Sequence, residues 1–145
     1  MSKASLKQLM ANALSVSSKS DALELTVDVT PYPQSRPRVC RTNTYELPSV
    51  AQYKRTVRTC AVQMMNGREP LEGCIEASLI IRRNKKVDSK AFGDIDNHQK
   101  AVFDALNGVC YTDDSHIVAV HVSKQKSKLE GIDVVIKKWQ GSDLP

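Results

Sequence analysis

Residues 94–122 read DIDNHQKAVFDALNGVCYTDDSHIVAVHV, a helical pattern followed by a strand pattern. Apolar residues recur every three or four positions between residues 96 and 107, as on one face of an α-helix. Gly108 follows, and glycine is common just after a helix end. Valines then alternate over residues 118–122, as in a half-buried strand. The stretch therefore predicts a helix, a short return and a strand. The expected apolar face of the helix comprises Gln99, Val102, Phe103 and Leu106.

The same periodicities predict the remaining elements. Alternation over residues 22–30, 75–81 and 132–136 indicates three more strands. A helix is expected over residues 48–66, because proline suits a first helical turn. Prolines indicate an extended arm between the first strand and this helix. The expected fold is α+β: a single small mixed sheet of about four strands with two main helices packed on it. We expect the basic turn 124–128 to join the last two strands as a hairpin.

A chain of 145 residues has room for one domain with a hydrophobic core. We expect an N-terminal extension over residues 1–20, with a short helix at 3–16 and a Ser-rich linker. The main domain is then 21–140, and 141–145 form a C-terminal tail. No segment approaches the roughly 18 apolar residues of a membrane span, and a secretory signal is also absent, which favours a cytoplasmic protein. The four cysteines have no zinc-like spacing and are expected to be reduced and mostly buried.

Charge is unevenly distributed along this basic chain, whose net charge is +5. Residues 31–69 carry seven basic and two acidic side chains, whereas residues 94–114 carry five Asp against one Lys. Basic stretches bind phosphate, and an acidic island can hold the cations used in phosphate chemistry. The pattern indicates a metal-using nucleic-acid enzyme. For each run taken alone, a solvated surface remains the alternative.

Asp94 and Asp96 stand where a loop enters the predicted helix, and Asp113 and Asp114 precede the next strand. The helix and its return can bring both acidic pairs to one edge of the sheet. Hard oxygen ligands suit Mg²⁺ or Mn²⁺, which activate water beside a phosphate. Two structural alternatives stay open. Asp96 also fits the role of a helix N-cap, and the Asp113–Asp114 pair is also typical of a turn. A DxD motif also occurs in nucleotide-sugar transferases, but this chain has no Gly-rich nucleotide loop.

These residues carry a recognisable signature. Residues 94–106 fit a D-x-D-N-x-x-K-x-x-x-D-x-L core, Asp113–Asp114 supply a D-D before a strand, and residues 33–38 fit P-x-x-R-P-R. Over roughly residues 23–137 the chain resembles the RusA-type Holliday-junction resolvases, which are crossover junction endodeoxyribonucleases. The resemblance implies a small homodimer that nicks four-way DNA junctions symmetrically during recombination and repair. It implies Mg²⁺ as the cofactor, with Mn²⁺ able to substitute, in a bacterial or phage-infected cell.

The resemblance also implies roles for individual residues. Asp94, Asp96 and Asp114 would bind metal and act in catalysis, with Asp113 as an additional metal-binding helper. Lys100 matches the family's essential lysine and would either hold the scissile phosphate or offset the charge that develops on it. Its structural alternative is an ion pair with Asp96 or Asp104, one helical turn away.

Basic side chains outside the acidic island are expected to hold the DNA arms, so that binding weakens steeply with salt. Other branched DNA is a further candidate partner, and the sequence leaves open whether flaps and forks are cut. The main alternative is a catalytically inactive protein that binds branched DNA. The expected DNA-binding residues are Arg36, Arg38, Arg82, Arg83, Lys85, Lys86, Lys124 and Lys126.

Overall fold

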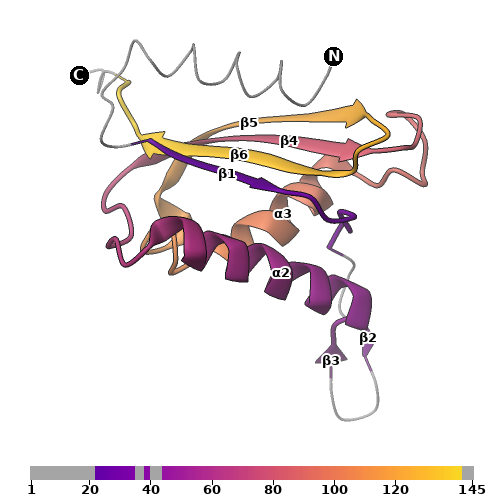
Figure 1. The fold of residues 1–145 in the computed structure, drawn as a ribbon, viewed down its shortest axis with the longest axis horizontal. Helices are drawn as coiled ribbons and strands as arrows, with labels where there is room; N and C mark the ends of the chain where they lie inside the picture. The colour runs from indigo at the N-terminus through magenta and orange to yellow at the C-terminus, as the bar shows by residue number, and fades with distance from the viewer. Residues whose placement is uncertain (1–21, 35–37, 40–43, 142–145) are drawn as a thin grey trace.

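The computed structural model describes residues 22–34, 38–39 and 44–141, which form two layers (Figure 1). One layer is a four-stranded sheet, and both helices lie on the same side of it. This arrangement confirms the predicted α+β fold. The strands are β1 (Leu23–Val27), β4 (Ile75–Arg83), β5 (Ile117–Lys126) and β6 (Gly131–Lys138), and the helices are α2 (Pro48–Met65) and α3 (Ile95–Leu106).

The strand order is β1-β6-β4-β5, which makes the predicted hairpin between the last two strands wrong. β4 lies between them, parallel to β5 and antiparallel to β6. The reason is burial. β6 is buried at six consecutive positions, and β4 is buried or half-buried throughout, whereas β5 is partly exposed along its length. Strands with apolar residues on both faces favour central positions. The turn at residues 127–130 therefore crosses the end of β4, where Ser127 N–H donates to the Arg83 carbonyl at 3.0 Å.

The core lies between the sheet and the two helices. Alternate residues of β1, β4 and β6 point into it, and α3 contributes Val102, Phe103 and Leu106, as the helical periodicity predicts. Gln99 is only half-buried and lies at the border of this face. Burial of apolar area at about 25 cal/mol per Å² drives the packing. One side of α3 is thus buried in the core, and the other side is accessible to solvent.

The predicted arm between β1 and α2 contains a small two-stranded ribbon, in which β2 (Arg38–Val39) pairs antiparallel with β3 (Thr44–Tyr45) (Figure 1). Residues 38–39 and 44–45 are therefore extended, as expected, and the strand pairing between them is an addition that the sequence did not predict. Arg36 and the predicted 3–16 helix lie outside the described residues. The division into residues 1–20, 21–140 and 141–145 stays a prediction. Within the described residues, no helix has the length and apolar character required to cross a membrane.

The cysteines give a prediction that tests this packing. Cys74 is exposed, contrary to the expectation of mostly buried thiols, whereas Cys110 is buried and burial raises its pKa to about 11. Iodoacetamide attacks thiolates, so at pH 8 the native protein should be alkylated rapidly at Cys74 and not at Cys110. Peptide mass spectrometry after brief labelling measures both sites, with urea-unfolded protein as the control. Equal labelling of the two cysteines in native protein would contradict this core.

Candidate active site

A hollow of about 280 Å³ runs between α3 and the start of β5. Helical spacing places Asp96, Lys100 and Asp104 along the side of α3 that faces it. Asp114 reaches the hollow from a short 3-10 turn, Asp114–His116, directly before β5. Asp96, Lys100 and Asp114, which the sequence assigned to catalysis, therefore share one hollow. The full lining is Asp96, Gln99, Lys100, Phe103, Asp104, Asp114, Ile117 and Val120.

Asp94 lies in a neighbouring hollow with Pro33, Gln34, Lys90, Gly93 and Asn97. It occupies the N-cap position of α3, so the alternative that Asp96 is the N-cap is wrong. Its side chain makes no capping hydrogen bond, and the residue is exposed. The expected convergence of all the acidic residues is thus only partial: the Asp94 carboxylate is accessible but belongs to a different hollow from Asp114.

The donor set fits Mg²⁺ chemically. Across residues 22–34, 38–39 and 44–141, no three His, Cys, Asp or Glu side chains form a ready-made metal cage. Mg²⁺, however, keeps several waters and usually takes one or two protein carboxylates together with substrate phosphates. Asp96 and Asp114 offer two such carboxylates, and neither forms an ion pair with a basic side chain of the described residues. Both remain available to a cation.

Lys100 is exposed and forms no ion pair with any carboxylate in the described part of the chain, so its structural alternative is not observed. Asp104 pairs instead with Lys54 of α2, at 3.4 Å between Nζ and Oδ2. That contact joins the two helices. The Lys100 ammonium is consequently left free at the hollow, where it can bind an anion.

Asp113 serves the turn rather than the hollow. Its carboxylate accepts hydrogen bonds from the Ser115 hydroxyl and from the Ser115 backbone N–H, and it caps the 3-10 turn that starts at Asp114. The hydroxyl contact above all lowers the pKa of Asp113. It does not line the hollow that contains Asp114. The structure thus favours a turn-forming role for Asp113 over the expected metal-binding one.

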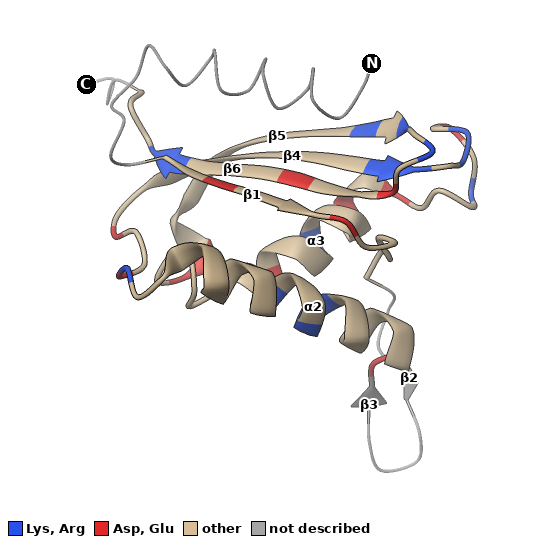
Figure 2. Ribbon diagram, viewed as in Figure 1, with Lys and Arg blue, Asp and Glu red and all other residues tan. Residues whose placement is uncertain are grey.

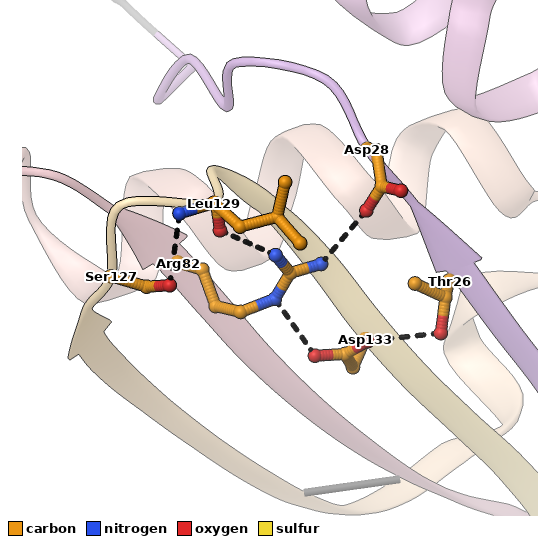
Figure 3. Close-up of polar contacts among 6 residues, drawn as sticks. All are labelled: Thr26, Asp28, Arg82, Ser127, Leu129 and Asp133. Atoms are coloured by element: carbon orange, nitrogen blue, oxygen red, sulfur yellow. Dashed lines mark hydrogen bonds and ion pairs between the residues drawn. The ribbon is translucent and has the colours of Figure 1, made fainter. Parts of the chain in front are cut away.

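Two residues expected to bind DNA lie in the interior. Arg82 is 1% exposed and pairs with Asp133, and Arg83 is 9% exposed and donates to the carbonyls of Ala91 and Phe92 (Figure 3 for Arg82). Their guanidinium groups cannot reach a DNA phosphate, so the expectation is corrected for both. Arg82 and Arg83 are the last two residues of β4. Arg82 contacts the turn 127–130 through the Leu129 carbonyl, and Arg83 contacts the loop before α3 through the Ala91 carbonyl.

The remaining predicted DNA-binding residues differ in how exposed their side chains are. Lys85, Lys86 and Lys126 are exposed at the ends of β4 and β5, where the ribbon in Figure 2 carries several blue segments of Lys and Arg. Lys124 is half-buried and donates from Nζ to the Gly93 carbonyl at 3.1 Å. Arg36 lies outside the described residues, as does the side chain of Arg38.

Gly93 is a requirement of the site that sequence patterns did not reveal. Its φ is +100°, and an added Cβ would lie 2.8 Å from both His98 Nε2 and Pro33 Cγ. Gly93→Ala should therefore lower the free energy of unfolding in urea by about 1–3 kcal/mol. Gly73→Ala is the matched control, because Gly73 also has a positive φ but has open space around it. Equal losses for the two variants would contradict close packing before Asp94.

Accessible carboxylates, an exposed lysine and basic strand ends on an α+β domain are features of enzymes that cleave phosphodiester bonds in nucleic acid. The family model for endodeoxyribonuclease RusA matches residues 28–137, most of the chain. The chain therefore belongs to the RusA endodeoxyribonuclease family and is a Holliday-junction resolvase, as its signature residues predict. Nucleases of this family are generally metal-dependent. A search of curated proteins found no match to this chain.

Proposed function

We propose that this chain nicks two symmetry-related strands of a four-way DNA junction, using Mg²⁺ held by Asp96 and Asp114. The observation that carries this assignment is the shared hollow of Asp96, Lys100 and Asp114, with both carboxylates free of basic partners among the described residues. Asp94 is proposed to contribute from the adjoining hollow. Mn²⁺ should substitute, because it accepts the same oxygen ligands.

Each side chain has a distinct task in this proposal. A bound Mg²⁺ would activate water and stabilise the leaving oxygen. Lys100 would hold a non-bridging oxygen of the scissile phosphate, since its ammonium is exposed beside the carboxylates. Asp113 would act by holding the turn that presents Asp114.

We propose that Lys85, Lys86 and Lys126 bind the DNA arms, together with Arg36 and Arg38. The three lysines are exposed. They lie near the end of α3 that carries Asp94, because the hydrogen bond from Lys124 to Gly93 holds that end of the helix beside the end of β5. Paired nicks on symmetry-related strands require two identical sites, so the active species is proposed to be a two-fold homodimer.

The test incubates the purified full chain with a synthetic four-way junction in Mg²⁺, Mn²⁺ or Ca²⁺, with a linear duplex of the same sequence as the control. We expect paired nicks in Mg²⁺ and Mn²⁺, binding alone in Ca²⁺, no cutting of the duplex and a dimer mass by light scattering. Flap and fork substrates show how far the activity extends to other branched DNA. Junction binding without nicking in either Mg²⁺ or Mn²⁺ would identify a non-catalytic binding protein instead.

A further inference from the structure

The loop that leads into Asp94 is held by cations from two neighbouring strands. Nη1 of Arg83, at the end of β4, donates to the carbonyls of Ala91 and Phe92, at 2.9 Å each. Nζ of Lys124, near the end of β5, donates to the carbonyl of Gly93 at 3.1 Å. Three successive carbonyl oxygens thus each accept a hydrogen bond from one of two cations. We call these contacts the 91–93 clamp.

The clamp lies at the border of the protein interior: Arg83 and Phe92 are buried, Gly93 and Lys124 are half-buried, and Ala91 is exposed. Phe92 is fully buried, its carbonyl also lies 2.6 Å from His98 Nε2, and the Lys124 ammonium stands 5.2 Å from the centroid of its ring. Parallel pairing of β4 and β5 brings the two cations to one end of the sheet, beside this loop. Neither Arg83 nor Lys124 forms an ion pair within the described residues. Removing a charge from water costs stability unless hydrogen bonds compensate it, and these carbonyls supply such hydrogen bonds to buried Arg83 and half-buried Lys124.

We propose that Arg83 and Lys124 are positioning residues, which hold the 91–93 backbone so that Asp94 and the first turn of α3 present their carboxylates correctly to the metal. This inference rests on the proposed function, because it assumes that Asp94 and Asp96 bind the catalytic cation. The clamp ends at Gly93, and Asp94 is the next residue. A displaced Gly93 carbonyl would move Asp94 directly, and it would move Asp96 through the start of α3.

Loss of the clamp and loss of a DNA-phosphate contact are expected to change different kinetic constants. Loss of a phosphate contact weakens junction binding and raises KM, with a smaller dependence on salt. Loss of a positioning residue lowers kcat and metal affinity, because partners that orient metal ligands typically contribute about 10–100-fold. Lys124 is the discriminating position, since its charge alone would favour the phosphate role.

The experiment compares Lys124→Met with Lys128→Met. Both changes remove one positive charge from the same basic segment, but Lys128 is exposed and is outside the clamp. Three quantities are measured: the Mn²⁺ affinity of DNA-free protein by electron paramagnetic resonance, the junction Kd in Ca²⁺, and kcat with KM in Mg²⁺. Lys124→Met should weaken Mn²⁺ affinity and lower kcat about tenfold or more. Its junction Kd should change no more than that of Lys128→Met.

Two further variants separate positioning from folding. Lys124→Arg and Arg83→Lys keep a cationic donor, so they should retain a fold close to wild type by circular dichroism and recover most of the Mn²⁺ affinity. If Lys124→Met raises KM with kcat and Mn²⁺ affinity unchanged, Lys124 is a phosphate-binding residue and the inference is overturned. Unchanged values in all three measurements overturn it as well. A wild-type protein that binds Mn²⁺ but never nicks would refute the proposed function, while the Mn²⁺ comparison would still test the clamp.

Discussion

Asp96→Asn should reduce nicking of a four-way junction in Mg²⁺ by at least about a hundredfold, while junction binding in Ca²⁺ stays within a few-fold of wild type. The amide keeps the size of the side chain but removes the negative charge that would hold the cation. Asp96 makes no ion pair in the described structure, and its carboxylate accepts a hydrogen bond from the adjacent Asn97 N–H. The change therefore affects the site far more than the fold.

Asp88→Asn is the matched control, because Asp88 is exposed in the loop after β4. The substitution removes the same negative charge at a position outside the hollow. Asp114→Asn should resemble Asp96→Asn, since both carboxylates line one hollow. Asp94→Asn measures the contribution of the neighbouring hollow, and we expect a substantial loss there too. Single-turnover cleavage of a labelled junction gives all four rates. An Asp96→Asn enzyme that cuts as fast as wild type would show that the active site lies elsewhere.

Arg82→Met should lower the free energy of unfolding by about 3–5 kcal/mol, because removal of one member of a buried ion pair leaves the other charge uncompensated. Figure 3 shows the network at the ends of β1, β4 and β6. Arg82 Nε donates to Asp133 Oδ2 at 3.0 Å, and Nη1 donates to the Leu129 carbonyl at 2.5 Å. Nη2 lies 3.4 Å from Asp28 Oδ1, and Thr26 donates to the second Asp133 oxygen at 2.9 Å.

Urea denaturation measures this loss, and Lys137→Met is the comparison, because Lys137 pairs with Glu76 at 3.3 Å in a more exposed setting. We expect that control to cost about 0–1 kcal/mol. The double variant Arg82→Met with Asp133→Val should lose less than the two single variants combined, since it leaves no buried charge unpaired. A stable Arg82→Met protein with weakened junction binding would restore Arg82 to the DNA-binding surface.

Several features of the site could be predicted because they depend on nearby residues. The helical spacing of Asp96, Lys100 and Asp104 follows from 3.6 residues per turn, so their common side of α3 was readable from the sequence. The signature around Asp94 also carried the family, which the match over residues 28–137 confirms. By contrast, charge alone could not separate exposed Lys85 from buried Arg83, because a basic residue at a strand end can face either solvent or a folded loop.

The sequence by itself determined the two main helices, the four strands of the sheet and the family, and it predicts which residues carry the chemistry, because periodicity and motif spacing are local properties of the chain. Only the tertiary structure decided that β6 lies between β1 and β4, because strand order depends on which strands must bury both faces. It likewise placed Asp94 in a different hollow from Asp96 and Asp114, and it put Arg82, Arg83 and Lys124 into supporting contacts. Those outcomes depend on contacts between residues far apart in the chain, where packing and desolvation, not charge or spacing, determine which groups a side chain meets.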